Sequence, residues 1–215
     1  MKKQNYIVIA SIILINACSE NNENPKFIEV EEQGSYFQPR PEPNPDKNAY
    51  FGDLHVHTSN SFDAYTFGTL ASPSDAYRFA QGEAIPHPTG YEIQLKKPLD
   101  FYAVTDHAVF LGIIKEAADT SSEFSKYEFT KPMHNLNENV SNSIFSILKR
   151  SGLFRGFGGA MREGLEDGTV DIELIEKVGK SVWGKTIKAA DDAYKPGIFT
   201  TFAGYEYTSS VELYD

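Results

Sequence analysis

The apolar positions divide the chain into a short apolar segment, a polar spacer and a domain of alternating strands and helices. Residues 6–15 form an apolar stretch, interrupted only by Ser11, after two lysines, and this stretch is shorter than the about 20 residues that a transmembrane helix needs. Residues 19–48 are polar and carry five prolines, which favour an extended, solvated chain. We therefore expect a signal peptide at 1–17, a proline-rich polar tether at 18–48 and a folded domain at 49–215.

The domain begins with a pattern of strand, helix, strand, helix and strand that predicts an α/β fold. Three segments are predicted as strands, and they span residues 50–57, 99–104 and 197–206. The middle one is mostly apolar, as expected for a strand that is covered on both faces. Helical patterns cover four further stretches, namely 109–118, 134–150, 171–194 and one that begins at the capping sequence Ser72-Pro73-Ser74-Asp75 and ends at Gly82. The glycine-rich segment 152–168 lacks the Gly-Lys-Ser/Thr of a phosphate-binding loop, so it predicts a flexible surface turn.

The charge balance narrows the range of partners. The chain carries 30 acidic and 20 basic side chains, a formal charge of −10, and 40% hydrophobic residues, which suffice for a core. Nucleic acid is not expected as a partner, because its affinity depends on clustered Lys and Arg that displace counterions. An anionic substrate would need positive charge supplied locally, and a bound metal is the simplest source.

The end of the apolar segment predicts how the protein is localised. Ile15-Asn16-Ala17-Cys18 resembles the lipobox of bacterial lipoproteins, in which the cysteine is lipidated and becomes the mature N-terminus. Cys18 is the only cysteine of the chain, so it cannot form an intramolecular disulfide. The resemblance implies a lipid-anchored protein of the bacterial cell envelope, at the outer membrane or the periplasmic face. The alternative is an ordinary secretory signal with a stray cysteine.

Metal-binding residue types stand at the C-terminal end of each predicted strand. His55 and His57 alternate with Val56 and therefore project to the same side of the first strand. Three further groups follow at strand ends or just beyond them, namely Asp63, the pair Asp106-His107 and Glu206. Parallel α/β sheets and barrels build their sites at these ends. A His-x-His pair alone arises easily by chance, but the combination predicts a metal site for zinc, manganese or iron.

Two segments resemble the first two motifs of the PHP (polymerase and histidinol phosphatase) superfamily of metal-dependent phosphoesterases. They are Asp53-Leu54-His55-Val56-His57-Thr58-Ser59 and Val104-Thr105-Asp106-His107. More narrowly, the chain is similar over about residues 49–210 to a bacterial branch known as a domain of unknown function. The segments that carry this similarity are Tyr50-Phe51-Gly52-Asp53-Leu54-His55, Ser61-Phe62-Asp63-Ala64-Tyr65, Asp75-Ala76-Tyr77-Arg78-Phe79-Ala80 and Phe202-Ala203-Gly204-Tyr205-Glu206-Tyr207-Thr208-Ser209.

The resemblance implies a TIM-like, distorted (β/α)7 barrel with two or three divalent metal ions at its C-terminal mouth. His55 and His57 would bind one ion, while Glu206 would bridge two. His107 would bind the second ion and Asp63 would reach a third. Asp106 would orient its neighbours rather than ligate directly. The implied activity is hydrolysis of a small, anionic phosphoester, with Asp106 and Glu206 as the candidate catalytic residues.

The family usually has several hundred residues and further ligands on later strands, so we expect this chain to carry only the first part of the barrel, without the C-terminal half. Two other functions remain open. Amidohydrolases also place His-x-His after the first strand, although we find no lysine at a strand end here, as their bridging ligand would require. A truncated chain could instead be a non-catalytic binding or structural lipoprotein. We expect His87 and His134 to be loop or capping residues and Trp183 to lie in the core.

Overall fold

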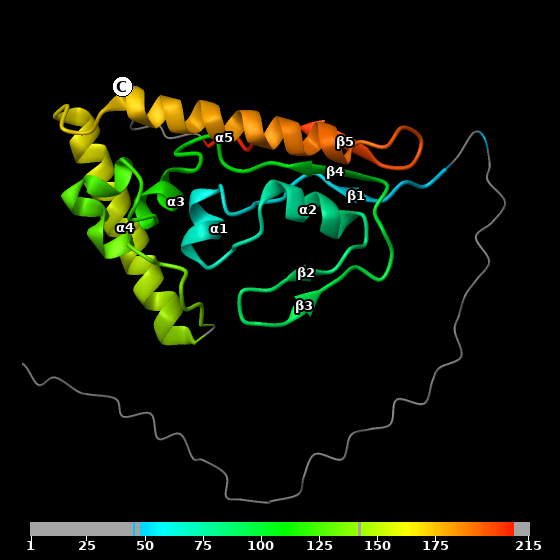
Figure 1. Ribbon diagram of the computed structural model, residues 1–215, viewed down its shortest axis with the longest axis horizontal. Helices are drawn as coiled ribbons and strands as arrows, with labels where there is room; N and C mark the ends of the chain where they lie inside the picture. Colours follow the sequence, from blue (N-terminus) through cyan, green and yellow to red (C-terminus); the bar gives the residue numbers. More distant parts are fainter. Residues whose placement is uncertain (1–44, 46–47, 142, 209–215) are drawn as a thin grey trace, which may run out of the picture. The chain divides into compact units, whose positions relative to one another are not determined.

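The computed structural model describes residue 45 and residues 48–141 and 143–208 (Figure 1). The described fold belongs to a compact unit that begins at Asn48. The predicted signal peptide, Cys18 and almost all of the predicted tether lie outside the described residues. Among the described residues, no helix combines the length and the apolar character needed to cross a membrane.

Three short parallel strands form the central sheet, which confirms a mixed α/β fold. They are β1 (Gly52–Asp53), β4 (Phe101–Val104) and β5 (Thr200–Ala203), in the spatial order β1-β4-β5. Each lies within one of the three predicted strands, but β1 is much shorter than residues 50–57, because only Gly52 and Asp53 pair with β4. The residues described here form no closed barrel.

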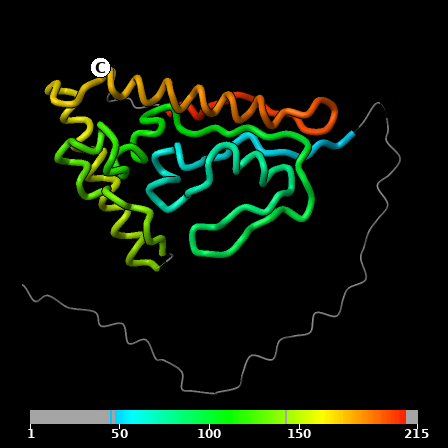
Figure 2. The backbone as a smooth tube through the Cα atoms, in the orientation of Figure 1, coloured from blue at the N-terminus to red at the C-terminus, as the bar shows by residue number. Residues whose placement is uncertain are grey.

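The other elements lie in the connections between these strands (Figures 1 and 2). The α-helices are α1 (Phe62–Thr66), α2 (Pro73–Ala80), α3 (Ile113–Ala118), α4 (Ile144–Glu166) and α5 (Ile172–Ala193). Two 3₁₀ helices are η1 (Phe124–Lys126) and η2 (Glu128–Met133), and an antiparallel hairpin pairs β2 (Ile85–Pro86) with β3 (Glu92–Ile93). The hairpin and the 3₁₀ helices are not part of the predicted pattern.

Helix α2 begins where its capping sequence predicts. The Ser72 side chain accepts a hydrogen bond from the Asp75 backbone N–H, and the Asp75 carboxylate accepts one from the Ser72 backbone N–H. These bonds satisfy donors that the first turn of a helix leaves free. The helix ends at Ala80, and Gly82 then adopts a φ of +86°, which glycine tolerates without strain.

Helices α2 and α5 cover one face of the sheet. Tyr102 and Val104 of β4 pack with Tyr77 of α2 and with the alanines of α5, and Phe199 completes this core. The Thr201 hydroxyl donates to the Ala190 carbonyl at 2.8 Å, which fixes β5 against α5. The predicted helix at 171–194 is confirmed as α5. The opposite face of the sheet is more open, and the side chain of Phe202 there is 48% exposed.

The glycine-rich segment is helical, so the prediction of a flexible surface turn at 152–168 is wrong. Nearly all of it belongs to the 23-residue helix α4. Glycine disfavours helix by about 1 kcal/mol per residue relative to alanine, but Phe157 and Met161 of this helix are buried against α3 and the 3₁₀ helices. This tertiary packing outweighs the low local propensity. The predicted helix at 134–150 begins only at Ile144.

Three smaller expectations have mixed outcomes. The helix predicted at 109–118 begins later, at Ile113, because Gly112 before it has a left-handed φ of +78°. His87 bonds to Thr89 within the β2–β3 turn, and His134 bonds to the Ser125 carbonyl, as expected for loop residues. Trp183 is only partly buried, and its ring meets that of Tyr205 edge to face.

Candidate metal centre

Five of the predicted ligands meet beyond the C-terminal ends of the three parallel strands. His55 and His57 follow β1, His107 follows β4 and Glu206 follows β5. Asp63 lies in the first turn of α1, a short helix that is not part of the predicted pattern. Residues 107 and 206 continue the pairing of β4 with β5 through an isolated parallel bridge. The strand order therefore accounts for the meeting of ligands that are far apart in the sequence.

His55, His57 and Glu206 form the first group of potential ligands. Glu206 Oε2 lies 3.0 Å from His55 Nε2 and 2.6 Å from His57 Nε2, so one carboxylate oxygen faces both imidazoles. The candidate ligand atoms of the group lie within 4.8 Å of one another. The three side chains thus offer two nitrogens and one oxygen to a single cation.

His57, Asp63 and His107 form the second group. Asp63 Oδ2 lies 3.1 Å from His57 Nδ1 and 3.6 Å from His107 Nε2. His107 Nε2 is also 3.9 Å from Glu206 Oε2. The two groups share His57 and lie side by side, as the ligands of a binuclear centre do.

His57 contributes a different nitrogen to each group, and its protonation limits what it can do. A neutral imidazole has one ring nitrogen with a free lone pair, while the other carries hydrogen. If Nε2 ligates a cation beside Glu206, Nδ1–H donates to Asp63. The carboxylate then orients the imidazole, an arrangement common around metal-bound histidines. Asp63 Oδ2 also faces His107 and could ligate a second cation there.

Hydrogen bonds and ring stacking hold His107 in place. Its Nδ1 lies 2.5 Å from the Thr208 hydroxyl, which leaves Nε2 directed towards Asp63 and Glu206. The ring of Phe62 stacks on the His107 imidazole with centroids 4.4 Å apart, and Phe154 of α4 stacks on the far side of Phe62. The long helix α4 thus supports a ligand of the centre through two aromatic rings.

The two carboxylates of the centre favour their charged forms. Burial raises the pKa of Asp63, but hydrogen bonds from the Ser61 hydroxyl and the Ala64 N–H outweigh it and hold the pKa below its ordinary value. Desolvation likewise raises the pKa of Glu206, while hydrogen bonds with His55 and His57 lower it, and the net shift is downward. Both carboxylates are therefore ionised at neutral pH, as a cation requires.

Asp106 belongs to neither group of ligands and lies beneath them. Its side chain is buried and accepts hydrogen bonds from the backbone N–H and the hydroxyl of Thr58, the latter at 2.7 Å. Burial raises its pKa above the ordinary value, and the bonds from Thr58 offset only part of that effect. Asp106 therefore ties the segment after β4 to the segment after His57. This position fits the orienting role that the resemblance implies.

The donor set fits a divalent transition metal. It combines three imidazoles with two carboxylates and contains no thiolate, which suits zinc, manganese or iron. His57 and His107 are mostly buried, with side chains 16% and 13% exposed, whereas His55 is 72% exposed. The centre therefore opens to solvent beside His55, where a substrate could approach.

Sequence reasoning missed four residues that support the ligands: Thr58, Ser61, Phe62 and Thr208. Three of them lie between His57 and Asp63, and the fourth lies two positions after Glu206. Hydroxyl residues so close to potential ligands are a usable signal, because metal-binding side chains are commonly oriented by nearby hydrogen-bonding groups. The stacking of Phe62 on His107 has no such local signal.

Comparisons with known proteins place the chain in one family. A search of curated proteins and a search of solved structures found no match. A family model does match residues 44–215, which is most of the chain. The protein therefore belongs to the family described as Protein of unknown function (DUF3604).

Proposed function

We propose that the protein is a metal-dependent hydrolase of the PHP type that splits a small, anionic phosphoester. The observation that carries this proposal is the presence of two overlapping groups of potential ligands that share His57. Three of the five histidines of the chain take part. Gathering imidazoles and carboxylates this closely costs part of their hydration, and a shared cation would compensate for that cost.

The residues of the centre have distinct roles in this proposal. His55, His57 and Glu206 would hold one cation, and Asp63 and His107, near Glu206, would hold a second. Bound divalent cations supply Lewis acidity and lower the pKa of water to about 7. Asp106 stays outside the centre and fixes the backbone of Thr58 next to His57.

Charge supports a phosphoester as the substrate. The chain has a formal charge of −10, so the protein as a whole repels anions. Two divalent cations in the centre would reverse this repulsion at its open side, beside His55. A phosphoryl group offers the oxygens that such a pair of cations stabilises during displacement.

Two predictions from the sequence, on the complete fold and on the location of the protein, are kept as proposals. We propose that β1, β4 and β5 are the first part of a TIM-like, distorted barrel whose further strands would cover the open sheet face around Phe202. We also propose that lipidation at Cys18 anchors the protein in the bacterial cell envelope. Parallel strands with ligands at their C-terminal ends are consistent with the first proposal.

Metal analysis of the purified protein tests the function. We expect the wild type, stripped with chelator and reloaded, to retain about two ions per chain. A His55→Ala, His57→Ala double variant should lose at least one of them together with phosphoesterase activity. His87→Ala is the matched control, because that imidazole bonds within the β2–β3 turn, away from the centre, and it should behave as the wild type.

Two results would contradict the proposal. Equal metal content in the wild type and the double variant would show that these histidines hold no ion. Hydrolysis of amides or lactones, without hydrolysis of aryl phosphate mono- and diesters, would refute the phosphoester as substrate. The proposed metal site would stand, with a substrate of the amidohydrolase type.

A further inference from the structure

The first turns of α4 expose a cluster of large apolar side chains. Ile144, Phe145, Ile147 and Leu148 are 60%, 79%, 42% and 62% exposed, and we call these four residues the α4 tip. Single exposed apolar residues are common on soluble proteins, but a contiguous group marks a contact surface. The buried contacts of α4 begin after these residues, with hydrogen bonds from Arg150 to the carbonyls of Thr66 and Leu136, and its apolar core contacts begin at Leu153. The tip therefore has no packing role within the described fold.

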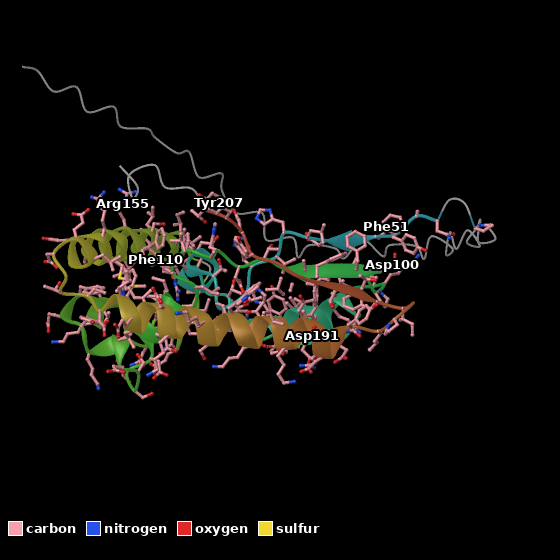
Figure 3. All side chains as sticks on the ribbon, turned by 90° about the horizontal axis from the view of Figure 1, so that it is seen from above. Phe51, Asp100, Phe110, Arg155, Asp191 and Tyr207 are labelled. Atoms are coloured by element: carbon pink, nitrogen blue, oxygen red, sulfur yellow. The ribbon has the colours of Figure 1, made fainter. Side chains whose placement is uncertain are left out.

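The part of α4 from Ile144 to Arg162 carries only positive charge. No acidic residue occurs between Ile144 and Arg162, although the whole chain has a charge of −10. Lys149 and Arg155 are exposed, and neither forms an ion pair with a carboxylate in the described part of the chain. The Arg155 side chain reaches outward from α4 (Figure 3). This end of the molecule therefore suits an anionic partner.

The order of apolar and basic residues along the helix matches the layers of a membrane surface. At 1.5 Å per residue, Lys149 lies about 6 Å behind Phe145 along the axis and Arg155 about 15 Å behind it. Surface-bound helices bury their apolar residues roughly 5–10 Å into the boundary between headgroups and acyl chains. With the tip at that depth, Lys149 reaches the phosphates directly and the long Arg155 side chain can extend towards them.

We propose that the α4 tip docks onto a membrane surface that contains anionic phospholipid, with Lys149 and Arg155 contacting the headgroups. This surface is separate from the proposed lipid anchor at Cys18 and from the candidate metal centre. The contact holds the folded domain against the bilayer, whereas an anchor on a tether only keeps it nearby. The surface does not depend on whether the protein is a hydrolase.

A tryptophan reporter at the tip tests the proposal on the full chain. Trp183 is the only tryptophan, so a Trp183→Phe, Phe145→Trp variant reports from α4 alone. The matched control is Trp183→Phe, Ile198→Trp, because Ile198 is 75% exposed in the turn before β5. Circular dichroism verifies that both variants fold. Any binding through residues 6–15 brings both variants to the vesicle equally. Only a tryptophan that itself inserts into the bilayer then lies among the acyl chains.

We expect vesicles of phosphatidylcholine with phosphatidylglycerol to shift the tip reporter's emission to the blue. Lipids brominated on their acyl chains should quench the tip reporter and leave the control reporter unchanged. Equal quenching in both variants, or none in either, would overturn the proposal. A blue shift that needs no vesicles and grows with protein concentration would also overturn it, because a second copy of the chain would then cover the tip.

Charge variants test the recognition of anionic headgroups. Each cation near an anionic membrane contributes about fivefold to partitioning, so Lys149→Gln with Arg155→Gln should raise the lipid concentration for half-maximal shift by roughly 30-fold. Lys180→Gln with Lys188→Gln removes two exposed cations from α5 instead. This control should change the lipid concentration for half-maximal shift only a little. Equal lipid dependence of the two double variants would overturn the electrostatic part of the proposal.

Discussion

Thr208 offers a direct test of how the candidate centre holds its ligands. Its hydroxyl lies 2.5 Å from His107 Nδ1, and a Thr208→Val substitution removes this hydrogen bond while keeping nearly the same side-chain shape. Phe62 still stacks on the imidazole, so the ring stays near its position. The substitution removes the bond that orients the His107 ring and keeps its hydrogen on Nδ1. With the hydrogen on Nδ1, the lone pair of Nε2 is free to bind a cation.

The expected loss is larger for metal affinity than for stability. Removing a hydrogen bond that orients a metal-bound histidine typically weakens metal binding by about 10–100-fold, which is about 1.4–2.7 kcal/mol. The same bond contributes about 0.5–1.5 kcal/mol to the stability of the metal-free fold. Thr208→Ser keeps a hydroxyl at the same distance along the side chain and should restore most of the affinity.

Competition against a metal-sensitive chelator measures the affinity, and urea unfolding of the metal-free protein measures the stability. The proposed orienting role of the Thr208 hydroxyl is refuted if the valine variant binds metal as tightly as the wild type. It also fails if the serine variant is as weak as the valine variant. Absence of metal binding in the wild type would instead refute the proposed function, so the two failures are distinguishable.

Two further predictions concern stability. Gly158→Ala should raise the free energy of unfolding by about 0.5–1 kcal/mol, because an added Cβ meets no atom within 4 Å. Gly164→Ala should lower the free energy of unfolding, because its Cβ would overlap the Val170 side chain. Urea denaturation measures both changes. Burial raises the pKa of Asp75, but bonds from Ser72 bring it below its ordinary value. The ionised Asp75 carboxylate therefore stabilises the fold fully above about pH 4, and this stabilisation is lost as the pH falls through the lowered pKa. Asp75→Asn should reduce the acid-induced loss of thermal stability between pH 5 and pH 2, and an unchanged loss would refute this role.

The parallel sheet and the meeting of the ligands could be predicted because both follow from strand ends. Alternating strands and helices require parallel pairing, and parallel pairing brings His57, His107 and Glu206 to one edge. The start of α2 could be predicted because the bonds of its capping box connect residues only three positions apart. In both cases, local rules determine the outcome.

The rest depends on contacts that a local pattern does not contain. Helix α4 forms across a run of glycines because Phe157 and Met161 pack into a core made from distant segments. The strand predicted at 50–57 shortens to β1, since its later residues turn towards the centre, where His55 and His57 meet Glu206. The hairpin of β2 and β3 has only two residues in each strand, too few for an alternating pattern.

In the proposed metal centre, the distance along the chain between His55 and Glu206, 151 positions, would link cellular metal supply to the lifetime of the protein. The group of His55, His57 and Glu206 is incomplete until the segment after β5 has docked beside His107, so the unfolded chain does not offer this site to a cation. A ligand that binds only the folded form stabilises it by about 2.7 kcal/mol at one hundred times its dissociation constant. Chains made under metal starvation would therefore unfold more often, be degraded faster and reach lower abundance.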